Sequence, residues 1–249
     1  MNALPPVRRQ VVVPAAADVA FRVFAERIGA WWPLARFSVH GEKATVEFRD
    51  GRLIETGPDG EVAEWGTVLH WQPPHELRMT WHPGRGPDQG GEVAVSFVPV
   101  TPTQTLVTIE HSGWEKYADP VAGRDEYRNG WPAVVGAFAA QLPGNADDGE
   151  PVWLVLHHTP APGVDNVFDH PGFRGHPAFL AQLRERGILV AAGPFPLSGE
   201  GMTILRLSEA SQVPDVVRAA TEDDSSVAAG VLDVHVRPWT PMITGTALT

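Results

Sequence analysis

Residues 176–194 read HPAFLAQLRERGILVAAGP, and they decide the fold class of the second half of this 249-residue chain. Apolar residues at helical spacing predict a short amphipathic helix that His176 opens. The apolar run that follows predicts a strand, and Gly193-Pro194 predicts a tight turn at its end. A helix that leads directly into a strand places this half of the chain in the α+β class.

Patterns on both sides of this stretch predict four strands and two helices. Their order is β-α-β-β-α-β, which is the order of a ferredoxin-like domain. The predicted strands are residues 152–158, 188–192, 202–207 and 231–238, and the predicted helices are residues 174–186 and 213–220.

His176 and Asp224 are the candidate catalytic residues of this half. Asp224 closes the second helical stretch, so two separate helices could bring an imidazole and a carboxylate together. An imidazole can shuttle a proton near neutral pH, and a carboxylate can fix its tautomer and orientation. The alternative is structural, with His176 as a hydrogen-bonded core or interface residue and Asp224 as the cap of a turn.

Five features between residues 151 and 240 follow the order seen in the YCII-related family. They are His176, the strand and turn at 188–194, Asp224, Ala229-Gly230 and Val236-Arg237-Pro238-Trp239. This part of the chain therefore resembles that family, which implies a dimeric α+β barrel and a His–Asp pair in a pocket. Pro177 directly after the histidine, and Ser225 where the family usually has proline, depart from its pattern.

His157 and His158 are neighbours on a predicted strand and therefore face opposite sides, so they cannot jointly hold one metal ion. One of them could look into the cleft beside His176, but a solvated position at the sheet edge is the favoured interpretation. No His-x-x-x-His or His-Glu-x-x-His motif is present. The sequence therefore predicts no metal site and no cofactor.

The first half of the chain predicts a curved antiparallel sheet wrapped around a C-terminal helix. A strand at 7–13 precedes a helix that Trp31-Trp32-Pro33 ends, and a long helix with an apolar stripe runs from Tyr127 to Leu142. Pro132 lies inside that stripe and is predicted to kink the helix or to mark its start. The strands between the two helices are predicted at residues 52–55, 61–71, 77–81, 93–98 and 106–111.

A long ordered series of motifs marks this half of the chain. The series is Trp31-Trp32, Gly51 to Glu55, Pro58-Asp59-Gly60, Gly66-Thr67-Val68-Leu69, Pro73-Pro74-His75-Glu76-Leu77, Thr105-Leu106-Val107-Thr108, His111-Ser112-Gly113-Trp114 and Gly130-Trp131. Residues 7–142 thus resemble the START/Bet v1-like (SRPBCC) superfamily, most closely its branch similar to activators of Hsp90 ATPase. The resemblance implies a helix-grip fold with a hollow for an apolar or amphipathic small molecule. It implies no reaction, because that fold hosts many functions.

Seven of the nine tryptophans fall in the first half of the chain. Aromatic side chains commonly line small-ligand pockets, and histidine offers a polar handle there. The glycine-rich segment at residues 84–91 lacks the context of a phosphate loop, and we expect a mobile hairpin loop that could gate the cavity mouth. Core packing is the alternative for each tryptophan. The candidate ligand-binding residues are Trp65, Trp81, Trp114, Trp131 and His111.

The composition is that of a globular protein, with 43% hydrophobic and 20% charged residues. The absence of cysteine excludes disulfides, thiolate catalysis and cysteine-ligated zinc. A net charge of −11 argues against nucleic acid as a partner. No stretch has the length of a membrane span and residues 1–6 lack a signal peptide's apolar core, so a cytoplasmic protein is expected.

These observations predict two domains, residues 1–143 and 151–240, with a polar linker at 144–150 and a tail at 241–249. One interpretation is an enzyme for elimination or isomerisation. Its first domain would bind an apolar or aromatic small molecule, and His176, oriented by Asp224, would move the proton without a cofactor. The alternative is a non-enzymatic ligand-binding or regulatory protein, related to stress or chaperones, that forms a homodimer through its second domain.

Overall fold

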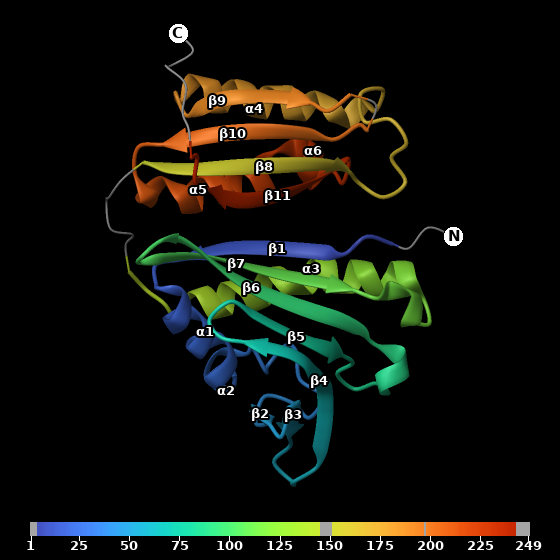
Figure 1. Cartoon of the computed structure of the whole chain (residues 1–249). Coiled ribbons are helices and arrows are strands. Elements are labelled where there is room, and N and C mark those ends of the chain that lie inside the picture. The colour runs from blue at the N-terminus through green and yellow to red at the C-terminus, as the bar shows by residue number, and fades with distance from the viewer. Residues whose placement is uncertain (1–3, 145–150, 197, 243–249) are drawn as a thin grey trace. The chain divides into compact units, whose positions relative to one another are not determined.

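The computed structural model describes residues 4–144, 151–196 and 198–242 (Figure 1). The chain divides into two compact units, residues 1–146 and residues 147–249. The predicted linker at 144–150 lies outside the described residues except for Gly144, and the predicted tail at 241–249 is described only as far as Met242.

Seven strands form the sheet of the first unit. They are β1 (Val7–Val13), β2 (Thr45–Arg49), β3 (Arg52–Thr56), β4 (Val62–Gln72), β5 (Glu76–Trp81), β6 (Gly91–Thr101) and β7 (Gln104–Ser112). Their order is β1-β7-β6-β5-β4-β3-β2, and every neighbouring pair is antiparallel. The predicted antiparallel sheet is therefore confirmed.

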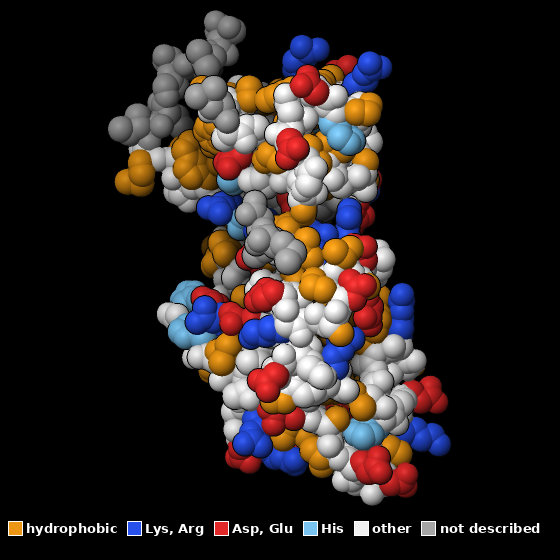
Figure 2. Space-filling model, turned by 90° about the vertical axis from the view of Figure 1, so that its right-hand side faces the viewer, with side chains coloured by type: hydrophobic (Ala, Val, Ile, Leu, Met, Phe, Trp, Pro, Cys, Tyr) orange, Lys and Arg blue, Asp and Glu red, His pale blue; other side chains and the backbone are white. Residues whose placement is uncertain are grey.

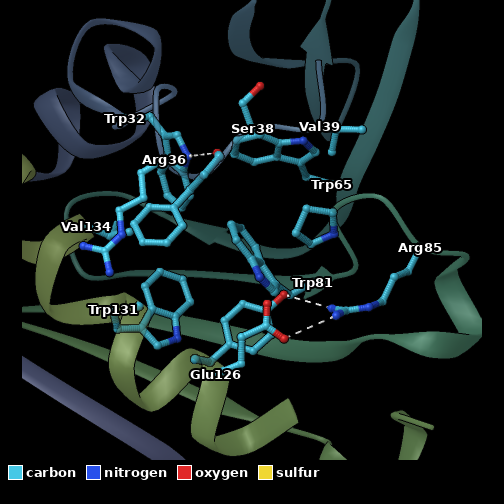
Figure 3. Close-up of a pocket in the computed structure, with 14 residues that line it drawn as sticks. Trp32, Arg36, Ser38, Val39, Trp65, Trp81, Arg85, Glu126, Trp131 and Val134 are labelled. Atoms are coloured by element: carbon cyan, nitrogen blue, oxygen red, sulfur yellow. Dashed lines mark hydrogen bonds and ion pairs between the residues drawn. The ribbon is translucent and has the colours of Figure 1, made fainter. Parts of the chain in front are cut away.

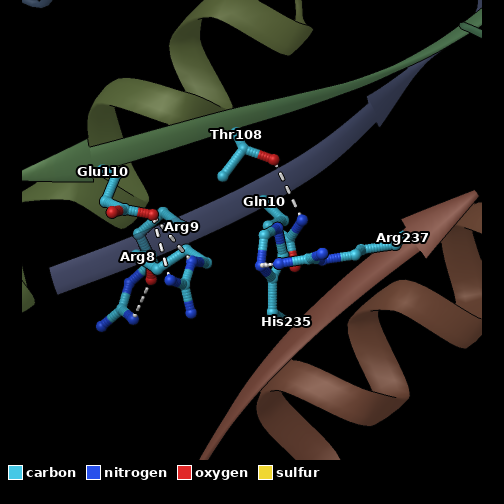
Figure 4. Close-up of polar contacts among 7 residues, drawn as sticks. All are labelled: Arg8, Arg9, Gln10, Thr108, Glu110, His235 and Arg237. Atoms are coloured by element: carbon cyan, nitrogen blue, oxygen red, sulfur yellow. Dashed lines mark hydrogen bonds and ion pairs between the residues drawn. The ribbon is translucent and has the colours of Figure 1, made fainter. Parts of the chain in front are cut away.

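Side chains also join β1 to β7, its neighbour in the sheet (Figure 4). The guanidinium of Arg8 lies 3.0 Å from a carboxylate oxygen of Glu110, and the side-chain amide of Gln10 donates to the Thr108 hydroxyl at 3.0 Å. Both are directly opposite pairs in the strand register. Cross-strand pairs of this kind stabilise a sheet, so they help to fix the register between β1 and β7.

Three α-helices accompany this sheet in the described part of the first unit: α1 (Ala17–Glu26), α2 (Ile28–Trp31) and α3 (Pro120–Ala139). The ring of Phe24 in α1 lies 5.7 Å from Phe97 of β6 and 5.2 Å from Phe138 of α3, between centroids. Near-perpendicular ring contacts of this kind are favourable. The core of the first unit therefore lies between one face of the sheet and the helices.

Helix α3 begins at Pro120, well before the predicted apolar stripe. The side chain of Asp119 accepts hydrogen bonds from the backbone N–H groups of Val121 and Ala122. This is the usual way in which a carboxylate caps a helix start, and proline is favoured at the position that follows. The polar first turns carry no apolar periodicity, which is why the sequence pattern did not reveal them.

Pro132 lies inside α3 and does not mark its start. A proline has no N–H for the carbonyl four residues earlier, which here belongs to Arg128. That carbonyl instead accepts a hydrogen bond of 2.7 Å from the guanidinium of Arg9 on β1. A neighbouring strand thus satisfies the group that proline leaves unpaired.

Strand β2 at the sheet edge was not predicted. Only Val46 on this strand is fully buried, while Thr45, Glu47 and Arg49 are exposed. A short edge strand with one buried residue carries too little alternation to be recognised. The other predicted strands of this unit are observed, with ends that differ by a few residues.

The second unit contains a four-stranded antiparallel sheet with helices after its first and third strands. Its elements are β8 (Val152–Pro160), α4 (Gly175–Glu185), β9 (Leu189–Pro194), β10 (Gly201–Leu207), α5 (Val213–Arg218), α6 (Ser225–Ala228) and β11 (Leu232–Trp239). The strand order is β11-β8-β10-β9. The strands and the two predicted helices follow the predicted order in the described part of this unit, and α6 is an additional short helix that was not predicted.

The position of Asp224 differs from the prediction. A π-helical turn, Ala219–Asp223, follows α5, and Asp224 then serves as the N-cap of α6 rather than as the end of the preceding helix. Its side chain accepts a hydrogen bond from the backbone N–H of Ser226. A carboxylate is one of the preferred N-caps because it satisfies an otherwise unpaired donor of the first turn.

Acidic and basic side chains are interspersed on the face that Figure 2 shows. Among the residues that the structure describes, no helix combines the length and the hydropathy needed to cross a membrane.

Candidate ligand-binding and acid–base sites

A cavity of about 240 Å³ opens in the first unit, and tryptophans form much of its wall (Figure 3). Trp32 follows α2, Trp65 lies on β4, Trp81 ends β5 and Trp131 lies on α3. All four side chains are buried. Elements far apart in the sequence therefore converge on one aromatic chamber.

The indoles hold one another in place. Ring centroids are 5.1 Å apart for Trp32 and Trp65, 5.6 Å for Trp32 and Trp81, and 5.4 Å for Trp81 and Trp131. Tilted contacts at these distances are favourable and restrict ring rotation. The wall of the cavity is thus preformed.

The rim of the cavity carries charge. Arg85 lies in the predicted glycine-rich loop, and its guanidinium donates to the Tyr127 hydroxyl at 3.2 Å and lies 3.6 Å from a carboxylate oxygen of Glu126. Arg36 also lines the cavity and is exposed. The loop is therefore tied to α3 through Arg85, a contact that no sequence pattern predicted.

The buried carboxylate of Glu55 on β3 accepts hydrogen bonds from residues that line this cavity. Burial acts to raise the pKa of its carboxyl, but the hydrogen bonds that it accepts outweigh burial and lower that pKa. Its role was not predicted, although a carboxylate among the apolar residues of a strand was a usable signal. The donors are the Ser38 hydroxyl, the N–H groups of Val39 and His40 at 2.8 and 2.9 Å, and the indole N–H of Trp65 at 2.8 Å.

The five predicted ligand contacts divide into two groups. Trp65, Trp81 and Trp131 line the cavity. Trp114 and His111 are fully buried and are absent from its lining, so they do not contact the cavity directly. Trp32 was predicted only as the end of a helix, and its place in the wall was overlooked.

His111 does not line the cavity, but it accepts a hydrogen bond from Trp131, which does. Its Nδ1 accepts from the indole N–H of Trp131 at 3.3 Å, and its Nε2 lies 3.1 Å from the Tyr117 hydroxyl. Burial, with a smaller effect from the Arg85 guanidinium, lowers the pKa of His111 to about 3. A neutral imidazole therefore orients Trp131.

The second unit brings His176 and Asp224 together. His176 lies in the first turn of α4, and its Nδ1 is 2.7 Å from Oδ2 of Asp224. Ser226 ties the pair from both sides, because its hydroxyl accepts from the backbone N–H of His176 at 2.8 Å and its own N–H donates to Oδ1 of Asp224 at 2.9 Å. Asp224 is completely buried. The arrangement suits a carboxylate that orients an imidazole.

His158 joins this pair, and its interpretation as a solvated edge residue was wrong. Its side chain is only 2% exposed, and its ring centroid lies 4.4 Å from that of His176. Burial, together with the neighbouring His176, lowers the pKa of His158 to about 3. His157 faces the other side of β8, where its Nε2 lies 3.1 Å from a Glu200 carboxylate oxygen, so the predicted opposite orientation is confirmed.

His158 and His176 both line a cavity of about 230 Å³ in the second unit. Apolar side chains such as Phe173, Leu180 and Leu232 complete most of its wall. The histidines therefore meet a space that can hold a small molecule.

Comparisons with known proteins concern the first unit. Residues 14–142 match the family model described as activator of Hsp90 ATPase homolog 1-like protein. No curated protein matches the chain.

Three solved structures illustrate this similarity. The self-sacrificing resistance protein CalC from Micromonospora echinospora is 26% identical; the match covers 57% of this chain and 96% of CalC, with a TM-score of 0.44. The anthrahydroquino-γ-pyrone synthase Txn09 is 32% identical over 57% of this chain and 100% of its own, with a TM-score of 0.41. The Aha1 dimer from Colwellia psychrerythraea is 14% identical over 55% of this chain and 95% of its own, with a TM-score of 0.41.

Proposed function

The chain belongs to the family of activator of Hsp90 ATPase homolog 1-like proteins, and from that premise we propose that its first unit binds a small apolar or aromatic molecule. The observation that carries this proposal is the preformed cavity walled by Trp32, Trp65, Trp81 and Trp131. Concave apolar sites with a few polar groups at the rim are typical of small-molecule binding.

The cavity volume of about 240 Å³ limits the size of the ligand. An apolar cavity of about 150 Å³ accommodates benzene, so this cavity suits a molecule of roughly one or two rings. The guanidinium of Arg36 at the rim would attract an acidic group on that molecule, because guanidinium pairs well with carboxylate. We therefore expect a small aromatic acid to bind better than its neutral counterpart.

Two glycines on α3 provide a matched test. Gly130 lines the cavity, whereas Gly136 on the same helix is exposed, and a Cβ atom added there would meet no neighbour within 4 Å. Gly130→Met should fill part of the cavity and weaken binding of 1-naphthoate about 5- to 150-fold, since overpacking costs about 1–3 kcal/mol. Gly136→Met should bind like the unaltered chain. Titrations followed by tryptophan fluorescence measure both affinities.

The same titrations can refute the proposal. Equal affinity of the Gly130→Met variant would show that the probe binds elsewhere. Equal affinity of the unaltered chain for 1-naphthoate and 1-naphthol would remove the role given to Arg36, while leaving the cavity itself as the binding site.

A second candidate function concerns the second unit, which we assign to the YCII-related family with a ferredoxin-like fold. The strand order β11-β8-β10-β9 supports the fold, and the 2.7 Å contact between His176 and Asp224 supports an acid–base pair. His176 would remove or deliver a proton in an elimination or isomerisation, and Asp224 would hold the imidazole in its productive tautomer.

Proton abstraction can be tested without knowing the substrate. Exchange of C–H protons beside a carbonyl for deuterium, followed by NMR over a panel of small keto acids in D₂O, reports the first step of such reactions. The unaltered chain should accelerate exchange of at least one compound, and His176→Gln should abolish that acceleration. No accelerated exchange, or equal exchange by the variant, would favour the non-enzymatic alternative.

We also propose that the second unit forms a homodimer, as the YCII resemblance implies. Trp153 and Trp239 are paired across β8 and β11 with ring centroids 5.7 Å apart, and Trp239 is 42% exposed. Trp153 is half-buried, and a tryptophan pair of which one member is exposed is a favourable centre for a contact between subunits. Light scattering should give twice the chain mass, and Trp239→Ser should shift the equilibrium toward the monomer.

A further inference from the structure

Three buried side chains of the second unit carry metal-ligating atoms close to one another. His158 on β8, His176 on α4 and Asp224 before α6 each offer one such atom, and these atoms all lie within 4.8 Å of one another. A tetrahedral zinc ion with bonds of about 2.0–2.1 Å holds its ligand atoms roughly 3.3 Å apart. Modest rotations of the His158 and His176 rings would therefore bring one nitrogen of each to this spacing, with Asp224 beside them.

His158 supplies an independent indication that something binds here. Both of its ring nitrogens are buried and lack a hydrogen-bond partner, although the side chain is only 2% exposed and lines the cavity. A buried polar group without a partner is costly, so native proteins rarely keep one without a reason. An ion at the cavity wall would give one of these nitrogens its partner.

The surroundings of His176 are those of a metal ligand. A carboxylate oxygen can only accept, so Nδ1 of His176 donates to Asp224 and Nε2 remains available. Histidine ligands usually donate their other ring nitrogen to a carboxylate in this way. Ser226 fixes both partners, and its hydroxyl donates in turn to the backbone carbonyl of Gly172 at 2.8 Å.

From this geometry we propose that the second unit binds one divalent transition-metal ion, with Zn²⁺ as the probe. Ring nitrogens of His158 and His176 hold the ion, and Asp224 orients His176 through the hydrogen bond to its Nδ1. Nitrogen ligands of this kind suit zinc and other first-row divalent ions. The cavity of about 230 Å³ beside the histidines provides an entry path and leaves room for water on the ion.

This site shares its residues with the proposed acid–base pair but does not rest on that proposal. Metal binding is measured without any substrate, so it can succeed where proton transfer fails. Conversely, deuterium exchange that persists after treatment with EDTA would show that His176 acts without an ion. The two proposals can therefore fail separately.

Calorimetry with Zn²⁺ on the full chain, without a histidine tag and after removal of EDTA, tests the site directly. The chain contains no cysteine, so thiolates contribute no background. One ion per chain should bind, with a dissociation constant in the micromolar range or below. His158→Gln and His176→Gln should each weaken binding at least about a hundredfold. Asp224→Asn should weaken it about 10- to 100-fold, as loss of an orienting carboxylate does.

His157→Gln is the matched control, because His157 directly precedes His158 on β8 and its side chain faces the other side of the strand. This variant should bind Zn²⁺ like the unaltered chain. Circular dichroism confirms that each variant is folded, and the visible absorption of Co²⁺ gives a second readout of nitrogen ligation. Absence of binding by the unaltered chain, or equal binding by a folded His158→Gln variant, would overturn the proposal.

Discussion

Glu55 links two parts of the first-unit cavity wall. Its carboxylate accepts hydrogen bonds from the segment at 38–40 and from the indole of Trp65. Glu55→Gln removes the charge and turns an amide N–H toward existing donors. We expect a loss of about 2 kcal/mol in the free energy of unfolding, since hydrogen bonds to charged groups contribute about 1.5–3 kcal/mol. Urea unfolding followed by tryptophan fluorescence measures this loss.

Glu47→Gln on β2 is the control for that prediction. Glu47 is exposed, and its ion pair with Arg49 lies at the surface. Such substitutions usually change stability by no more than about 0.5 kcal/mol. Equal effects of the two variants would contradict the role of Glu55.

His111 gives the first unit a dependence on pH. The folded protein lowers the pKa of this histidine to about 3, whereas an unfolded chain binds the proton near 6.5. The unfolded state therefore binds more protons between these values, and stability that is complete above pH 6.5 falls as the pH drops toward 3. The slope is about 1.4 kcal/mol per pH unit for one proton. The groups that face His111 are Trp114, Tyr117, Tyr127, Trp131 and Arg85.

Urea unfolding at pH 7, 6 and 5 measures this slope for the unaltered chain and for His111→Gln. Tryptophan emission reports mainly the first unit, because seven of the nine tryptophans lie there. The variant should show a shallower slope by about one proton. The same slope in both proteins would mean that the pKa of His111 in the folded protein is not lowered.

The sequence predicts a residue's role best where the side chain type is itself suited to few kinds of chemistry, as with histidine and aspartate. The sequence paired His176 with Asp224, and the structure places their side chains 2.7 Å apart although residues 177–223 separate them. His158 was misplaced, even though Val152, Leu154 and Leu156 alternate with less buried neighbours and set the inward face on which it lies. The supporting roles of Glu55 and His111 depend on contacts between distant segments, which no local pattern encodes.

Helix α3 contains a proline in its interior, and the effect of this proline on stability can be tested. Pro132 removes one helical hydrogen bond, and the Arg9 guanidinium satisfies the freed carbonyl of Arg128. Pro132→Ala restores an N–H inside the helix, and we expect the free energy of unfolding to rise by about 1–3 kcal/mol. Urea unfolding measures the gain.

Pro120→Ala on the same helix is the comparison. Pro120 occupies the first turn, where a missing N–H costs no helical bond and the fixed backbone angle is favourable. This variant should show no gain. If both variants stabilise the protein equally, the effect belongs to proline replacement in general and not to the interior of α3.

The elements themselves were predicted best where apolar alternation was long. β5, β6 and β8 were found because more and less buried residues alternate over most of their lengths. β2 has one fully buried residue and escaped detection. The π-helical turn at Ala219–Asp223 also escaped, because its conformation depends on the packing that brings Asp224 to His176 rather than on residue type.

At the scale of the whole molecule, each unit has its own sheet and its own helices. The first has a core between its seven strands and α3, and the second buries apolar residues of β8, β10 and β11 beneath α4 and α5. Both units fall within the range of about 50–250 residues that is typical of independent domains. Each of the two proposed sites therefore lies within one unit, the aromatic cavity in the first and the histidine cluster in the second.

We therefore expect residues 1–146 and residues 147–249 to fold when produced separately. Each fragment should unfold cooperatively in a thermal scan followed by circular dichroism. The first should retain the affinity for 1-naphthoate and the second the affinity for Zn²⁺, because all residues of each proposed site come from one fragment. A fragment that aggregates or melts without cooperativity would show that its core is incomplete alone. A fragment that folds but loses its ligand would show instead that the site depends on the other unit.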